Sequence, residues 1–240
     1  SIQASRIKHL TIMEIQRSLK SKNLSQAIDY AINVMSDSVP IQDLYLLYLD
    51  EDIEGNKVVQ YVVYRDFQKL FDSTDKPMPE LEKLIGEGKD VILPGNRDLA
   101  KIIPIDGSTE TMLLDGLVVE TLVGKVIVRP PEGTGLSMYS REILQVFGES
   151  LRQRLVDFNR EKNRLRQFLS PEVTRRLLKI HDYEKKHLAP HQAEIGILYA
   201  DISGFTKICE QVLVNPERIA RFFNSWSMGV VESLFREGGT

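Results

Sequence analysis

The sequence predicts an α+β fold with an antiparallel sheet flanked by helices, then a long helix and a shorter second α/β segment. Apolar residues recur at helical spacing near the start of the chain. Two strand-forming runs follow, separated by a short turn-rich stretch, and further short strands precede a long helical pattern. Runs of strands joined by short turns indicate an antiparallel sheet and therefore the α+β class.

The first 40 residues are expected to be helical, and Pro40 ends them. Asn23 is an expected N-cap, with Gln26 three residues later as in a capping box. The apolar residues that follow at helical spacing are Leu24, Ala27, Ile28, Ala31, Ile32 and Met35. They predict one buried helix face.

Residues 44–49 and 58–64 are two runs with strand character on either side of an acidic, turn-rich stretch. Their simplest arrangement is an antiparallel hairpin. After it we expect a short helix at residues 79–85, ended by Gly86 and Gly88.

Four short strands are expected next, at residues 90–93, 101–105, 117–121 and 125–128. Gly124 is expected at the bend between the last two.

A long helix is predicted to begin near Ser140. Residues spaced three or four apart then form a seam, which consists of Leu144, Phe147, Leu151, Leu155, Phe158, Lys162, Leu165 and Leu169. This spacing favours a parallel two-stranded coiled coil and hence a homodimer through residues 144–169. The alternative is that the seam packs on its own domain.

Composition restricts the class of protein. Hydrophobic residues make up 42% and charged residues 27%, and no apolar run is long enough for a membrane helix. A single cysteine, Cys209, excludes an intrachain disulfide and suggests a reducing, cytoplasmic location.

Net charge is −7 over residues 1–150 (16 basic, 23 acidic) and +4 over 151–240 (15 basic, 11 acidic), which suggests two units. The basic stretch at 151–179 is interpreted as a solvated helix face rather than a nucleic-acid surface.

Residues 194–206 carry the chemistry. An apolar run expected to be a buried strand leads into Asp201, then a turn at Gly204, and a helix is expected near Thr206. Ile208, Cys209 and Val212 are expected on the buried side of that helix. An aspartate there can supply a hard oxygen ligand to Mg²⁺, and the turn can offer N–H groups to phosphate. The alternative is that Asp201 only caps a helix or forms a turn.

Residues 201–206, Asp-Ile-Ser-Gly-Phe-Thr, resemble the first metal-binding motif of class III adenylate and guanylate cyclases. Residues 167–173 resemble the segment that leads into those catalytic domains. Residues 215–217, Asn-Pro-Glu, open a helix that ends in residues 237–240, Glu-Gly-Gly-Thr, as in the family. The resemblance covers residues 167–240 and implies a ferredoxin-like α/β segment.

The family carries two divalent cations, Mg²⁺ or Mn²⁺, which assist attack of the ribose 3′-oxygen on the α-phosphorus of a nucleoside triphosphate. The resemblance implies that Asp201 and the main-chain oxygen of Ile202 bind metal. It implies that Gly204, Phe205 and Thr206 bind the phosphates. The family's second metal-binding aspartate follows a Gly-Gly-Thr turn and would lie after Thr240. We therefore expect a piece of a longer protein that is inactive as 240 residues, with ATP and GTP both open as the substrate.

The order of elements in residues 5–158 resembles a GAF domain, most clearly at residues 117–130 and 137–155. The expected organisation is a GAF-like sensor at 1–150, a helical linker and pre-catalytic segment at 151–190, and the truncated start of a cyclase domain at 191–240. No residues are assigned to a GAF ligand. The expected function is regulation and part of the catalysis of cyclic-nucleotide synthesis in signalling. The alternative is a non-catalytic ligand-binding or dimerisation module with a degenerate cyclase-like tail.

Overall fold

The computed structural model describes residues 2–21, 23–52, 56–95, 97–116, 122–190, 192, 194 and 196–239. The helices are α1 (Ile2–Ser21), α2 (Leu24–Met35), α3 (Pro79–Ile92), α4 (Met138–Leu165), α5 (Pro171–Leu178), α6 (Phe205–Lys207) and α7 (Pro216–Arg236). The strands are β1 (Asp43–Glu51), β2 (Lys57–Arg65), β3 (Gln68–Asp72), β4 (Glu110–Asp115) and β5 (Leu122–Arg129). A 3₁₀ turn covers Leu99–Lys101, and π-helical turns cover Glu184–Leu188 and Ile208–Leu213. Among these residues no helix has both the length and the apolar character needed to cross a bilayer.

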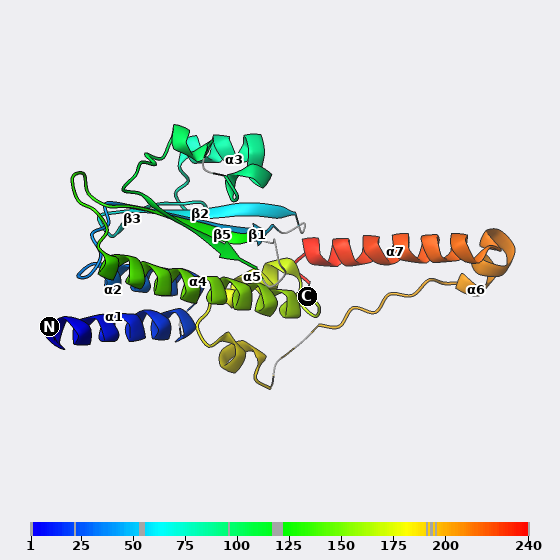
Figure 1. Cartoon of the computed structure of the whole chain (residues 1–240). Helices are drawn as coiled ribbons and strands as arrows, with labels where there is room; N and C mark the ends of the chain where they lie inside the picture. Colours follow the sequence, from blue (N-terminus) through cyan, green and yellow to red (C-terminus); the bar gives the residue numbers. More distant parts are fainter. Residues whose placement is uncertain are drawn as a thin grey trace.

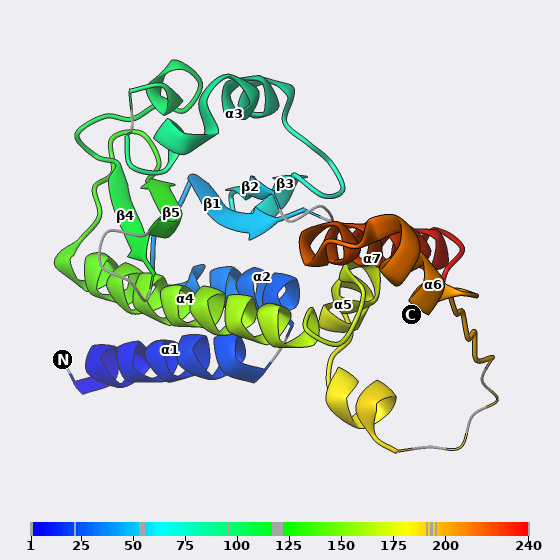
Figure 2. The ribbon, with the colours of Figure 1, turned by 90° about the vertical axis from the view of Figure 1, so that its right-hand side faces the viewer.

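The five strands form one antiparallel sheet in the order β3-β2-β1-β5-β4. Helices α2 and α4 cover one face, with α1 packed outside them, and α3 lies on the opposite face (Figures 1 and 2). Side chains of β2 alternate between the two faces: Val62 and Tyr64 pack toward the helices, and Tyr61 and Val63 pack toward α3. The predicted α+β class and antiparallel sheet are confirmed.

The first part of the chain folds as its sequence predicts. Asn23 caps α2, because its Oδ1 accepts a hydrogen bond from the main-chain N–H of Gln26 at 2.9 Å. The six residues of the predicted apolar face are all buried, namely Leu24, Ala27, Ile28, Ala31, Ile32 and Met35. Strands β1 and β2 form the predicted hairpin, in which Leu47 pairs with Tyr61.

Asp43 links β1 to the strands on either side of it. Its Oδ1 accepts a hydrogen bond from Arg65 Nε at 2.7 Å, and its Oδ2 accepts one from Arg129 Nε at 2.9 Å. Asp43 is buried, so its charge requires these partners. The two arginines lie on β2 and β5, so one carboxylate joins β1 to both neighbouring strands.

Several predictions between residues 79 and 129 are wrong. The helix expected to end at Gly86 and Gly88 continues to Ile92, with a kink at Gly88, and therefore replaces most of the strand expected at 90–93. The strand expected at 101–105 is absent, because the chain there forms a 3₁₀ turn at Leu99–Lys101 followed by irregular backbone. The strand expected at 117–121 lies outside the described residues.

Gly124 does not sit at a bend. It lies inside β5 and pairs with Tyr48 on β1 and Leu114 on β4. A Cβ atom at this position would lie 2.8 Å from the main-chain oxygen of Leu47, so the close approach of β5 to β1 requires glycine.

The helix after residue 137 is two helices. Ser137 caps α4, which ends at Leu165, and Ser170 caps α5. The seam residues Leu144, Phe147, Leu151 and Leu155 are buried in the core of their own domain, and Phe158 packs against that core. The coiled-coil interpretation is therefore wrong for this part of the seam, and its alternative, packing on the same domain, is confirmed.

The C-terminal part differs most from expectation. Residues 194 and 196–200 form no strand, and Ile197 and Tyr199 are 83% and 88% exposed. Helix α6 begins at Phe205, close to the expected Thr206, and α7 begins at Pro216 after the cap Asn215. The residues expected on a buried helix side are not buried: Ile208 and Cys209 are half-buried and Val212 is exposed. Strand formation requires a hydrogen-bonded neighbour, and among the described residues none pairs with 196–200.

Candidate functional site

Residues 201–206 form a turn whose backbone conformation depends on Gly204. Gly204 has φ 74° and ψ 19°, the left-handed region that side chains disfavour. Phe205 donates its main-chain N–H to the oxygen of Ile202 at 3.2 Å, which closes the turn before α6 begins. Asp201 is thereby placed immediately before a tight turn into a helix.

Asp201 does not act as a cap in this structure. Its side chain is exposed, and it makes no hydrogen bond or ion pair with any described residue. The N-cap of α6 is Gly204, which has no side chain to accept a bond. A capping or turn-forming aspartate would accept a main-chain N–H. The carboxylate of Asp201 is instead directed to solvent and uncommitted within the described chain.

Aromatic contacts join the turn to α7. The Phe205 ring lies 6.5 Å from Phe222 and 6.2 Å from Phe223, and Phe223 lies 6.2 Å from Trp226, measured between ring centroids. Such pairs stabilise the approach of two elements. The hydroxyl-bearing Thr206 is exposed in the first turn of α6. The five predicted site residues lie within the six-residue stretch 201–206, and Phe205 is the one that contacts a second element, α7.

The oxygen donors at this turn do not complete a metal site. Mg²⁺ prefers six oxygen ligands in octahedral geometry. Asp201 and the main-chain oxygen of Ile202 are two candidate donors, and no group of three or more His, Cys, Asp or Glu side chains comes together within the described ranges. The described residues therefore fit part of the coordination shell of a hard cation and do not complete it.

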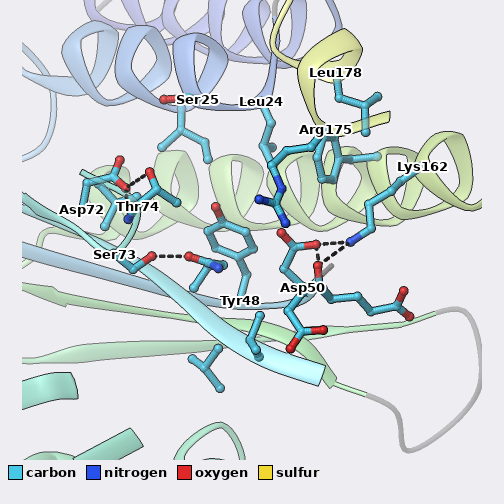
Figure 3. Close-up of a pocket in the computed structure, with 18 of the residues that line it drawn as sticks. Leu24, Ser25, Tyr48, Asp50, Asp72, Ser73, Thr74, Lys162, Arg175 and Leu178 are labelled. Carbon is cyan, nitrogen blue, oxygen red and sulfur yellow. Dashed lines mark hydrogen bonds and ion pairs between the residues drawn. The ribbon is translucent and has the colours of Figure 1, made fainter. Parts of the chain in front are cut away.

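A second candidate site is a cavity of about 1120 Å³ at the end of the sheet, beside α2, α4 and α5 (Figure 3). It lies where the first turn of α2, the end of β1, strand β2, the end of α4 and the whole of α5 converge. Apolar walls come from Leu24, Ile28, Val62, Phe158 and Leu178. Sequence reasoning missed this cavity, because it depends on where α5 is placed after α4, beside the end of the sheet.

The carboxylates at the α4 side of this cavity are paired. Lys162, the polar position of the predicted seam, bonds to Asp50 and also donates to the main-chain oxygen of Glu51 at 3.4 Å. Arg166 forms an ion pair with Glu51. These two pairs tie the end of α4 to the end of β1 and neutralise the charges there.

The carboxylates at the β3 side are also engaged. Asp72 accepts hydrogen bonds from the N–H and the hydroxyl of Thr74, at 2.9 and 2.7 Å. Asp29 does not line the cavity, but it accepts from the hydroxyl of the lining residue Tyr64 and pairs with Lys69 at 2.8 Å. Glu82, from α3 at the far end of the cavity, accepts from the Tyr61 hydroxyl at 2.6 Å.

Several polar side chains in the cavity wall have no partner among the described residues, and Thr174, Arg175 and Tyr48 are three of them. Thr174 is 1% exposed, and its Oγ1 is buried without a hydrogen bond. Arg175 and Tyr48 both point into the cavity, and neither makes a hydrogen bond or ion pair within the described residues (Figure 3). Burial, followed by the nearby charges of Asp50 and Asp72, raises the pKa of Tyr48 above its ordinary range, so its hydroxyl stays protonated.

A scan of the sequence against models of known protein families finds no match. A search among curated proteins likewise finds no significant relative.

Proposed function

We propose that this chain is the sensor and the first catalytic segment of a class III nucleotidyl cyclase, which converts ATP or GTP to the 3′,5′-cyclic nucleotide and pyrophosphate. The observation that carries the proposal is the uncommitted carboxylate of Asp201 beside the left-handed Gly204. A purely structural aspartate would accept a main-chain hydrogen bond there, and this one accepts none from the described residues. The class III motif at 201–206 gives that carboxylate its expected role.

In this proposal the turn residues have separate tasks. Asp201 and the main-chain oxygen of Ile202 are the part of the divalent-cation site that this chain supplies. Gly204, Phe205 and Thr206 contact the triphosphate, since a tight turn entering a helix presents main-chain N–H groups to phosphate oxygens. The stacking of Phe205 on α7 fixes the position of the turn.

The sensor role is proposed for the sheet and its helices. The order β3-β2-β1-β5-β4 with helices on both faces supports the GAF resemblance at the level of architecture. A homodimer remains part of the proposal. The buried residues of α4 from Leu144 to Leu155 are not its interface, because they already fill the core of their own domain.

The test is a chimaera. Residues 194–240 of this chain replace the matching segment of a class III cyclase catalytic domain of known activity, and cyclic nucleotide is measured with Mn²⁺ and either ATP or GTP. The proposal predicts activity within about tenfold of the unmodified domain, since the grafted segment supplies an equivalent carboxylate and turn. A folded chimaera without measurable product would favour the degenerate-tail alternative.

A further inference from the structure

We infer that the cavity between the sheet and α5 is a binding site for a small amphiphilic anion, with Arg175 as its charged contact. This inference concerns binding and does not depend on cyclase activity. It goes beyond the turn at Asp201, which lies elsewhere in the chain.

The cavity wall holds charges of both signs, so an anion would bind where a cation is left without an ion-pair partner. Asp50 and Glu51 are neutralised by Lys162 and Arg166. Arg175 is exposed and has no carboxylate partner among the described residues, although the unpaired Glu87 also lines the cavity. A guanidinium is always protonated and carries five N–H donors, so its natural complement is a carboxylate or phosphate group.

Two hydroxyl groups without a hydrogen-bond partner also favour a bound anion. Thr174 and Tyr48 each carry an O–H that can donate, and neither bonds to a described residue. The Thr174 hydroxyl is buried, and native proteins rarely leave such a group without a partner unless water, an ion or a ligand completes it, whereas Tyr48 is only half-buried. Thr174, Arg175 and Tyr48 all line this cavity, and Arg175 and Tyr48 point into it (Figure 3).

Size and the apolar walls define the rest of the ligand. The cavity of about 1120 Å³ is larger than an inorganic ion needs. Leu24, Ile28 and Phe158 offer an apolar surface beside the donors. An organic body with one anionic group therefore fits better than free phosphate.

Binding would link α5 to the sheet. Thr174 and Arg175 lie on α5, whereas Tyr48 lies on β1. A ligand held by all three would restrain α5, whose first residues belong to the segment 167–173 that resembles the entry to a cyclase domain. A regulatory role for this restraint rests on the proposed cyclase function, whereas binding of the anion does not.

The experiment titrates the 240-residue chain with phenylacetate, phenyl phosphate and the neutral benzyl alcohol by calorimetry. At least one anion should bind with a Kd on the order of 1 mM or tighter, and benzyl alcohol at least about tenfold more weakly. The two anions separate a carboxylate site from a phosphate site. In hydrogen exchange, the bound anion should slow the main-chain amides of α5.

Arg175→Gln should weaken the anion about tenfold or more, because it removes a charge-assisted hydrogen bond. Arg176→Gln is the matched control, since Arg176 is an exposed neighbour on α5 that does not line the cavity, and it should change Kd less than about twofold. Equal effects of the two variants would show non-specific charge attraction and overturn the inference. It would equally be overturned by the absence of saturable binding for both anions, or by benzyl alcohol binding as tightly as they do.

Discussion

Asn23 donates from its Nδ2 to the main-chain oxygen of Lys179 at 3.1 Å. The same side chain accepts the N–H of Gln26 at the start of α2, so one amide serves the first turn of α2 and the end of α5. These residues are 156 positions apart, which makes the bond a direct tie between the sheet-packed helices and the segment after α4.

Asn23→Asp tests this tie. Aspartate caps a helix as well as asparagine, so α2 should keep its cap. The carboxylate cannot donate to Lys179, and the loss of a bond worth about 1 kcal/mol should speed amide exchange in α5 about fivefold. Hydrogen exchange with mass spectrometry measures this. Asn163→Asp, the same change on an exposed part of α4, is the control, and unchanged exchange in α5 would show that the bond does not hold the helix.

Thr174→Val should stabilise the ligand-free chain. Valine has nearly the same shape and removes a buried hydroxyl that lacks a partner, a group that costs about 1–3 kcal/mol. The melting temperature should rise by about 2–4 °C for each kcal/mol. Thr11→Val is the matched control, because the Thr11 hydroxyl donates to the oxygen of Ile7 at 3.0 Å and its loss should not stabilise. A fall in melting temperature for Thr174→Val would mean that this hydroxyl is satisfied in solution.

Leu151→Glu separates the two interpretations of the seam on α4. Leu151 is fully buried in its own domain, so a carboxylate there should destabilise the fold by about 4 kcal/mol or more. A coiled-coil interface would instead yield a folded monomer. Circular dichroism melting and size-exclusion chromatography distinguish these outcomes, with Asn163→Glu on the exposed side as the control.

Elements with strong local sequence signals were predicted correctly, and elements without such signals were missed. Helix α2, the β1–β2 hairpin and the start of α7 have caps, periodicity or turn residues that act within a few positions, and all three were predictable. Strands β3 and β4 were missed because both are at the edges of the sheet, where residues are half-exposed and the alternation is weak.

Periodicity also shows which face is buried without showing what covers it. The seam spacing on α4 predicted burial correctly but not the partner. The cavity has no sequence signal of its own, because Thr174 looks like an ordinary helix residue until α5 is placed against the sheet. The motif at 201–206 was visible because its residues are consecutive, whereas the buried strand expected before it depends on a pairing neighbour.

Lys125 should make stability depend on pH. Its side chain is buried, and desolvation lowers its pKa from 10.5 to about 8 although its Nζ donates to the oxygen of Gly95 at 2.6 Å. Between about pH 8 and 10.5 the unfolded chain binds more protons at this group than the folded chain, so its contribution to stability rises with pH.

The measurement is denaturant unfolding of the wild type and Lys125→Met across that range. The free energy of unfolding of the wild type minus that of the variant should increase from pH 8 to 10.5 and be flat below pH 7. Lys83→Met, at an exposed lysine of α3, supplies the comparison. A difference that falls as pH rises would contradict the lowered pKa of the buried Lys125 amine.

The most direct test of the account is Asp201→Asn in the cyclase chimaera, with Glu210→Gln as a matched change in charge at an exposed position nearby. Both variants should melt at the temperature of the unmodified chimaera, because neither side chain is buried. Loss of a carboxylate that binds metal removes several kcal/mol of transition-state stabilisation, so Asp201→Asn should lower the rate of cyclic-nucleotide formation about a thousandfold, while Glu210→Gln leaves it within a few-fold. An Asp201→Asn chimaera that keeps activity within a few-fold of its parent at saturating Mn²⁺ would contradict the proposed role of Asp201 and the function built on it.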